Sequence, residues 1–293
     1  MSKKLRNVTL ALLLIVTVIS FSACGNDAET TSETVDGYSE GEFESAEIDE
    51  ETLKVTPISG ECGSNLTFNL TEDGTLTISG TGSMKQFTYD ENTNAAVTPW
   101  FDQKDGIKKV VIESGVEKIS PRLFCTYKNI EEVILPEGIV KLDTSTFLGC
   151  EKLKTINIPN SVSFIGISAF QDCASLESIT LPPELGELCQ SAFKGCKSLK
   201  GIEIPNGVEE IYNGAFWGCE SLEEITIPSS VTKIESYAFN NCNSLKKVTI
   251  PASVTTIESN AFSGCGNLTV YTTKESIAET YCTESGINVE IIN

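Results

Sequence analysis

The sequence predicts a β-rich solenoid in which short parallel strands stack along one axis, joined by short helical or turn corners. Three observations predict it. A Phe recurs every 23 residues from Phe101 to Phe262, an apolar-x-apolar-Pro step follows most of these Phe residues at a fixed offset, and a Cys lies three residues after most of them. A constant period of this size is typical of stacked repeats, because one unit alone cannot bury its apolar face.

Each repeat is expected to contain one strand, one return segment and one corner, as residues 222–242 illustrate. In "LEEITIP" the side chains of Ile225 and Ile227 alternate inward, as they do in a strand. Pro228 ends the strand because it cannot donate to a hydrogen-bonded ladder. The segment "SSVTKIES" then turns the chain back, and "YAFNNC" makes the corner.

Two columns of side chains are expected to fill the core at the corners. They are Phe124, Phe147, Phe170, Phe193, Phe216, Phe239 and Phe262, and Cys150, Cys173, Cys196, Cys219, Cys242 and Cys265. Free Cys packs as a small hydrophobe, and side chains that project one per rung do not converge tetrahedrally on a metal. We therefore interpret these Cys residues as packing groups and expect no metal and no cofactor.

Disulfides between neighbouring rungs remain an alternative, because rungs spaced about 4.8 Å apart fall within the allowed Cα range. The pairing of Cys62, Cys125, Cys189 and Cys282, which lie outside the column, is left open.

The repeat consensus "IPxxVxxIxxxAFxxCxxLxx" resembles the 23-residue BspA-like leucine-rich repeat of bacterial surface proteins. "SGECGSNLTFNLTEDGTLTISGTGSM", followed by "PWF" and "VVIESGVEKI", resembles the N-terminal region that such proteins often carry. "NLTVYTTKESIAETYCTESGINVEII" resembles their C-terminal cap. The resemblance covers residues 58–293 and implies a curved leucine-rich-repeat stack, surface display and partner binding. It implies no catalytic residues.

Both ends of the stack are expected to be capped, because an open end leaves a sheet edge or core exposed. The stretch "NLTFNLTEDGTLTISG" alternates around Asp73 and Gly74, which indicates a β-hairpin. Residues Glu275 to Glu284 are expected to form a short helix over the last rung. We expect five segments, namely a signal peptide at 1–23, a tether at 24–56, an N-terminal β cap at 57–100, leucine-rich repeats at 101–268 and a helix and strand cap at 269–293.

The N-terminus resembles a bacterial lipoprotein signal, in which a Cys is lipidated and becomes the mature N-terminus. Lys3, Lys4 and Arg6 precede the apolar run Val8–Phe21, and two small residues stand before Cys24. We expect lipid attachment at Cys24, with ordinary secretory cleavage as the alternative. Residues 25–54 carry eleven acidic residues and one Lys, so we expect a disordered tether.

Composition excludes several classes of function. The net charge is −20, whereas phosphate binding relies on clustered Lys and Arg, so no nucleic-acid partner is expected. The chain has no His, which removes Ser-His-Asp and Cys-His catalysis. Acidic pairs such as Glu209–Glu210 are the remaining candidates for acid–base chemistry.

One column of charged residues has a structural explanation. It consists of Glu131, Lys154, Glu177, Lys200, Glu223 and Lys246, all at one repeat position. In a parallel stack these become neighbours of alternating sign, which stabilises the register without any ligand.

Four aromatic residues lie outside the core positions of the repeat, and they are Trp217, Tyr212, Tyr237 and Phe164. Lys194 and Asn240 occupy the Trp217 position in the adjacent repeats, so we expect this position to face solvent. Exposed Trp and Tyr are enriched at binding hot spots, although scattered surface aromatics are also common. A second candidate surface is the concave sheet around Glu203, Glu224 and Lys247.

The sequence therefore predicts an exported, lipid-anchored cell-surface protein, monomeric, that presents its solenoid to a protein or glycan partner. One alternative is an envelope structural or assembly protein with a partner from the same cell. A remote alternative is a carbohydrate-active enzyme, but no enzymatic activity is expected.

Overall fold

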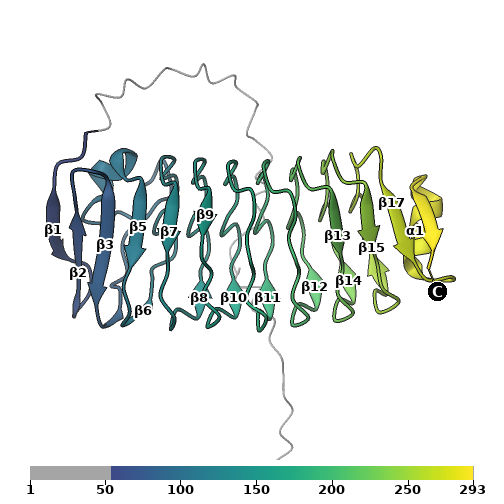
Figure 1. Cartoon of the computed structure of the whole chain (residues 1–293), viewed down its shortest axis with the longest axis horizontal. Helices are drawn as coiled ribbons and strands as arrows, with labels where there is room; N and C mark the ends of the chain where they lie inside the picture. Colours follow the sequence, from purple (N-terminus) through teal and green to yellow (C-terminus); the bar gives the residue numbers. More distant parts are fainter. Residues whose placement is uncertain (1–53, 293) are drawn as a thin grey trace, which may run out of the picture.

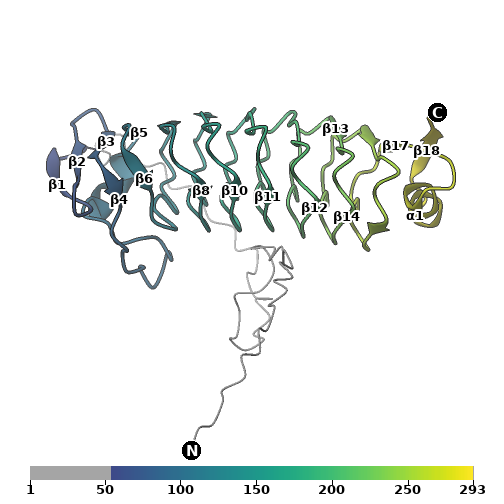
Figure 2. The ribbon, with the colours of Figure 1, turned by 90° about the horizontal axis from the view of Figure 1, so that it is seen from below.

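The computed structural model describes residues 54–292. The chain forms an elongated β-solenoid of about 8 turns, whose rungs follow one another along the long axis (Figure 1 and Figure 2). This confirms the predicted fold class of stacked parallel strands. The signal peptide, Cys24 and nearly all of the expected tether lie outside the described residues.

One side of the solenoid, here called the long-strand face, carries the longer strands. It comprises β1 (Ile58–Glu61), β2 (Leu66–Leu70), β3 (Thr75–Gly80), β5 (Lys109–Ile112), β7 (Glu132–Ile134), β9 (Thr155–Ile156), β13 (Glu224–Thr226), β15 (Lys247–Thr249), β17 (Thr269–Thr272) and β18 (Asn288–Ile291). From β3 onward the paired strands are parallel, and within the repeats residues 23 apart lie opposite each other, as Val110 and Val133 do.

A second side, here called the short-strand face, carries the return segments. It comprises β4 (Gly82–Ser83), β6 (Val116–Lys118), β8 (Lys141–Leu142), β10 (Phe164–Ile165), β11 (Glu187–Leu188), β12 (Glu210–Ile211), β14 (Lys233–Ile234) and β16 (Thr256–Ile257). These short strands also pair in parallel, for example Ile211 with Ile234.

The third side of each rung is a corner, and it is hydrogen-bonded from rung to rung although it contains no strand. From Phe147 to Phe239 the N–H of each column Phe donates to the Ala carbonyl of the next rung, at 2.8 Å from Phe193 to Ala215 and again from Phe216 to Ala238. Two residues after the Phe the backbone is left-handed, and Gly218 occupies this position with a φ of 73°. The corners therefore form a continuous backbone ladder.

The Phe column stacks ring on ring through the core. Neighbouring centroids from Phe124 to Phe262 lie 5.1–5.8 Å apart, with interplanar angles of 2–14°. Phe101 keeps the 23-residue spacing but does not join this column. It begins the 3₁₀ helix Phe101–Gly106 and is half-buried, because the preceding Trp100 fills the core at this end. Tyr127 closes the column with an edge-on contact to Phe124.

The Cys column lies beside the Phe column and makes its own set of hydrogen bonds. Each thiol donates to the carbonyl of the Phe 26 residues earlier, for example from Cys219 to Phe193 at 3.3 Å and from Cys242 to Phe216 at 3.1 Å. All six column thiols are buried and free, as are Cys62, Cys125 and Cys282. Burial raises the pKa of the Cys173, Cys196 and Cys219 thiols, so they are poor nucleophiles.

The predicted column of alternating charge is confirmed as three ion pairs between neighbouring rungs. Lys154 meets Glu131 at 2.8 Å, Lys200 meets Glu177 at 2.6 Å, and Lys246 meets Glu223 at 3.2 Å. These pairs are exposed, so each contributes at most about 1 kcal/mol. They favour the register more than they stabilise the fold.

Both predicted caps are present. β2 and β3 form an antiparallel hairpin around Asp73, whose carboxylate accepts from the N–H and hydroxyl of Thr75. At the other end α1 (Ile277–Ser285) begins at the N-cap Ser276 and ends at Gly286, in the left-handed conformation typical of a C-cap. β18 then pairs with β17 and extends the long-strand face by one strand.

Replacing Phe216 by Ala should lower the free energy of unfolding by about 3–5 kcal/mol, because a cavity opens within a closely stacked column. The measurement is urea unfolding. Phe101→Ala is the matched control and should cost clearly less, since Phe101 is half-buried and outside the column. Equal losses for the two variants would show that the stacked column is not what holds the rungs together.

Cys219→Ala should be mild, because little volume is lost and the Phe193 carbonyl keeps its bond from the Cys196 N–H, at 3.2 Å. Cys219→Asp should be severe, because it buries an unpaired charge. Thermal melts of the two variants compare these costs. Rapid labelling of native Cys219 by a thiol reagent would contradict its burial.

Candidate functional site

Two of the predicted aromatic residues meet at the corner edge. The rings of Trp217 and Tyr237 are stacked, with centroids 5.5 Å apart and planes 21° from parallel. The Lys194 ammonium lies 4.4 Å from the Trp217 ring centroid, and Asn260 Nδ2 donates to the Tyr237 hydroxyl at 3.4 Å. These four residues come from four successive rungs, and we call them the aromatic strip.

Exposure varies along the strip. Tyr237 is 37% exposed and Asn260 is exposed, whereas Lys194 and Trp217 are half-buried. Asn240, at the Trp217 position of the next rung, is only 8% exposed, so the expectation of a solvent-facing column is wrong at this residue. The repeat position alone therefore does not fix exposure at the corner.

Both faces of the Trp217 indole are covered. Lys194 comes from the preceding rung and Tyr237 from the following one, so the indole lies between an ammonium group and a phenol ring. A cation over an aromatic face contributes about 0.5–1 kcal/mol at an exposed site. What remains open to a partner is the ring edges, the Tyr237 face turned away from Trp217, and the polar groups of the two residues.

Tyr237 adopts an unfavourable backbone conformation. Its φ is 59°, in the left-handed region, where a bulky residue is an outlier. The other rungs are left-handed at this position too, and the residues there are Arg122, Ser145, Ser168, Ser191, Gly214 and Asn260. Such strain costs about 1–3 kcal/mol and persists only where the surroundings hold it in place.

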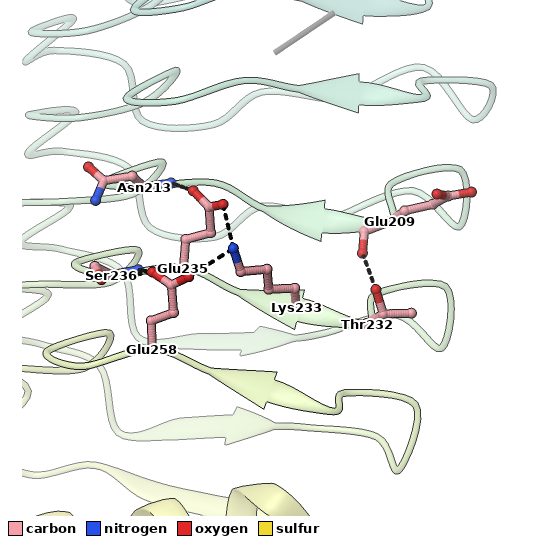
Figure 3. Close-up of polar contacts among 7 residues, drawn as sticks. All are labelled: Glu209, Asn213, Thr232, Lys233, Glu235, Ser236 and Glu258. Atoms are coloured by element: carbon pink, nitrogen blue, oxygen red, sulfur yellow. Dashed lines mark hydrogen bonds and ion pairs between the residues drawn. The ribbon is translucent and has the colours of Figure 1, made fainter. Parts of the chain in front are cut away.

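A cluster of half-buried charged residues, Lys233, Glu235 and Glu258, lies on the short-strand side and holds the backbone next to Tyr237 (Figure 3). Lys233 Nζ lies 2.9 Å from a Glu235 oxygen and 2.8 Å from a Glu258 oxygen. The second Glu258 oxygen accepts from the N–H and the hydroxyl of Ser236, at 3.0 and 2.8 Å. Ser236 directly precedes Tyr237, so the Glu258 carboxylate fixes the entry to the strained residue.

Glu235 repeats this contact one rung earlier, where its second oxygen accepts from the N–H of Asn213 at 2.9 Å. The hydrogen bond from Lys233, followed by that from Ser236, lowers the pKa of Glu258. The hydrogen bond to Glu258, followed by that to Glu235, raises the pKa of Lys233. Glu235 and Glu258 share one repeat position, which is the signal in the sequence by which this cluster could have been found.

The other two predicted aromatics lie elsewhere. Phe164 belongs to β10 on the short-strand face, is half-buried, and has the Lys141 ammonium 4.9 Å from its ring centroid. Tyr212 directly follows β12 and is half-buried. The ring stacking of the strip therefore involves two of the residues that the sequence singled out.

The structure separates the three predicted residues of the long-strand face, because Glu224 and Lys247 lie together on paired strands and Glu203 lies in a cavity. Glu224 and Lys247 lie opposite each other on β13 and β15, and the Lys247 ammonium is 5.5 Å from the Tyr271 ring centroid. Glu203 lies one rung earlier, where it lines a cavity of about 490 Å³. The full lining is Ile179, Thr180, Leu181, Pro183, Glu203, Ile204, Pro205, Asn206, Thr226 and Pro228. We call this cavity the central groove.

Within residues 54–292, no group of three or more His, Cys, Asp or Glu side chains is arranged to hold a metal ion. In the same part of the chain no helix is both long and apolar enough to cross a membrane.

The stacked parallel strands and the side-chain columns at the corners define a leucine-rich-repeat solenoid. The family model for the BspA type leucine rich repeat region matches in 6 copies, over residues 64–177, 95–222 and 164–282. The chain therefore belongs to the BspA-type leucine-rich-repeat family. This family and fold are typical of non-enzymatic binding modules. Among curated proteins, none matches the chain.

Several solved structures are similar. A leucine-rich repeat protein from Bacteroides ovatus is 23% identical, with a TM-score of 0.52, over 77% of this chain and 66% of that one. One from Eubacterium ventriosum is 23% identical, with a TM-score of 0.46, over 75% of this chain and 73% of that one. A leucine rich cell surface protein from Faecalibacterium prausnitzii is 19% identical, with a TM-score of 0.33, over 78% and 97%. The first of these likenesses supports the fold.

Replacing Glu258 by Gln should loosen the aromatic strip, because it weakens the bonds to Lys233 and Ser236. The same loosening should occur in the unchanged protein at acid pH. A lowered carboxyl pKa stabilises the fold above the ordinary value of about 4.3, and this stabilisation is lost as the pH falls through the lowered value.

Near-ultraviolet circular dichroism and Trp fluorescence report the stacking of Trp217 in both experiments. Glu209→Gln is the matched control, since Glu209 contributes only its main-chain carbonyl to the contacts in Figure 3. An unchanged Trp217 signal in Glu258→Gln would show that the cluster does not position the strip.

Proposed function

We propose that this chain is a lipid-anchored cell-surface protein that binds a protein partner through the aromatic strip. The observation that supports this most is Tyr237, which occupies a strained backbone conformation and stacks on Trp217 at the surface. The neighbouring rungs keep the same left-handed backbone with Gly214 and Asn260, so the corner itself does not require a Tyr here. Strained residues cluster at ligand-binding positions.

A protein partner fits the strip better than a glycan does. A sugar ring stacks on an open aromatic face, whereas Lys194 and Tyr237 cover both faces of Trp217. The open ring edges and the Tyr237 hydroxyl suit the mixed apolar and polar contacts of a protein interface. The family also supports a protein-interaction module.

Trp217→Ala should weaken binding of the partner by about 2 kcal/mol or more, which is roughly thirtyfold, the scale of an interface hot spot. The melting temperature should change little, because Trp217 is half-buried at the surface. Phe164→Ala is the matched control, since Phe164 is also half-buried and lies beside a Lys.

The binding assay compares the three mature chains on two immobilised protein sources, the cell's own envelope proteins and extracellular proteins of the surroundings. Binding that is lost only in Trp217→Ala supports the strip and identifies the source of the partner. Equal binding by Trp217→Ala and the unchanged chain would refute the role of the strip. A large fall in melting temperature would place Trp217 in the core.

The anchor has a separate test, which concerns a residue outside those described. With Cys24 intact the mature chain should partition with membranes, and Cys24→Ser should release it or leave it unprocessed. Mass spectrometry of the mature N-terminus measures the modification directly. An unmodified Cys24 at the N-terminus would contradict lipid anchoring.

A further inference from the structure

The corner ladder runs in one direction along the solenoid. In six successive rungs, from Phe124 to Phe239, the N–H of the column Phe donates to a main-chain carbonyl of the next rung at 2.8–2.9 Å. The N–H two residues after the Phe does the same in all six rungs, for example from Gly218 to Asn240 at 2.8 Å. Both N–H groups of a corner therefore point toward the C-terminal end of the stack.

The last corner keeps this conformation but has no further rung in front of it. The Phe262 ring stacks on Phe239 with the planes 2° apart, and the Cys265 thiol donates to the Phe239 carbonyl at 3.2 Å. Gly264 is left-handed with a φ of 82°, as Asn241 is in the preceding rung with a φ of 57°. The N–H groups of Phe262 and Gly264 thus point away from the preceding rung, and neither has an acceptor among residues 54–292.

A cavity of about 560 Å³, here called the end pocket, lies on the side to which these N–H groups point. The last corner forms one wall, and the end of α1 with the start of β18 forms the other. α1 lies beyond the last rung, where Tyr281 contacts the Phe262 ring edge-on at 6.1 Å (Figure 1). The full lining is Asn260, Phe262, Ser263, Gly264, Cys265, Gly266, Leu268, Tyr281, Ser285, Gly286, Ile287 and Asn288.

α1 closes the core incompletely at this corner. Cys265 is 7% exposed, whereas the other five Cys residues of the column are fully covered. Phe262 is only 2% exposed, and a buried donor without a partner carries its full desolvation cost. An acceptor that entered the end pocket from outside the chain would remove this cost.

The lining of the end pocket favours a neutral acceptor. It contains no Lys, Arg, Asp or Glu, so an anion would meet two N–H groups without any cation, in a chain of net charge −20. A main-chain carbonyl is neutral, and it is the acceptor that the ladder uses in every earlier rung. These donors therefore suit a polypeptide better than a phosphate or a carboxylate.

The end pocket is continuous with the aromatic strip. Asn260 is the last residue of the strip, where its side chain donates to the Tyr237 hydroxyl, and it also lines the end pocket. A protein surface that contacts Trp217 and Tyr237 therefore needs to extend only one rung further to reach the two N–H groups.

We propose that the end pocket holds a turn segment of the protein partner, which takes the place of a further corner. The main-chain carbonyls of two alternate residues in the segment accept from the N–H groups of Phe262 and Gly264. Unpaired main-chain groups at the edge of a fold commonly hold peptide segments in this way. The residue two before the column Phe is left-handed in every corner, so we expect Gly or Asn in the segment. This proposal rests on the proposed function for the existence of a protein partner.

The experiment uses the capped peptide acetyl-Asn-Gly-Ala-Ala-Ala-Gly-amide and its all-D counterpart. The L-peptide reproduces the corner 213–218 with Ala in place of Phe216 and Trp217, because α1 occupies the place of a further core ring. Amide NMR of the mature chain should show shifts at Phe262 and Gly264 with the L-peptide. The D-peptide has the same composition but the opposite hand, so it should bind about tenfold more weakly.

Two results with the peptides would overturn the proposal. One is equal binding of the L- and D-peptides, which would show unspecific contact. The other is an absence of shifts at Phe262 and Gly264 at millimolar peptide, including the case in which Val289 and Glu290 of the edge strand β18 shift instead.

Gly266→Leu should block the end pocket. Side chains at this repeat position reach the next rung, as Lys197 does toward Glu220 at 3.2 Å, and a Cβ at Gly266 meets no atom within 4 Å. The variant should weaken L-peptide binding about tenfold with an unchanged melting temperature. Asn243→Leu is the matched control, since it lies at the same position one rung earlier and outside the lining. Equal peptide binding by the two variants would contradict the proposal.

Trp217→Ala separates the end pocket from the aromatic strip. Trp217 lies two rungs before the pocket and outside its lining, so this variant should bind the L-peptide as the unchanged chain does. Failure of the strip would thus leave the peptide measurement intact, and failure of the pocket would leave the test of the strip intact. A loss of peptide binding in Trp217→Ala would show that the peptide lies on the strip, which contradicts the proposal.

Discussion

The structure depends on one set of contacts between neighbouring rungs at their corners, here called the corner interlock. A column Phe stacks on the Phe residues above and below it, and its N–H donates to the Ala carbonyl of the next rung. Its carbonyl accepts from the thiol of a Cys 26 residues later. One residue type thus joins core packing to two hydrogen bonds with the next rung, one donated by its N–H and one accepted by its carbonyl. Because every partner lies at a fixed separation, an insertion within any rung would break the interlock on both sides.

A continuous corner ladder leaves the other sides of the rungs free to vary. The long-strand face is interrupted between β9 and β13, where the bridge between Ser178 and Gly201 remains, yet the corners of these rungs, at Phe193 and Phe216, keep their bonds. The left-handed Tyr237 is likewise tolerated beside a column Phe. Local costs of about 1–3 kcal/mol are small beside a corner bond and a stacked ring in every rung. The aromatic strip lies where a bulky Tyr237 stands at a position that the neighbouring rungs give to Gly214 and Asn260.

The sequence predicts what depends on the period alone. The columns, the charge pairs such as Lys200 with Glu177, the hairpin and the terminal helix all follow from residue type and spacing. It does not predict what depends on particular neighbours. Phe101 leaves the column because Trp100 fills the end of the core, Asn240 is buried where Lys194 is not, and Trp217 is covered on both faces. The interruption of the long-strand face between β9 and β13 is likewise not visible in any single repeat.

Amide hydrogen exchange tests the corner interlock most directly. The N–H groups of Phe193 and Phe216 donate to the next rung at 2.8 Å, so we expect them to exchange only on global unfolding. Phe262 belongs to the last rung, and within residues 54–292 its N–H has no acceptor although its ring is stacked and buried. We expect it to exchange at least about a hundredfold faster than Phe193, whose protection should approach the full free energy of unfolding. Similar rates at Phe193 and Phe262 would show that side-chain burial, and not the corner ladder, holds the rungs together.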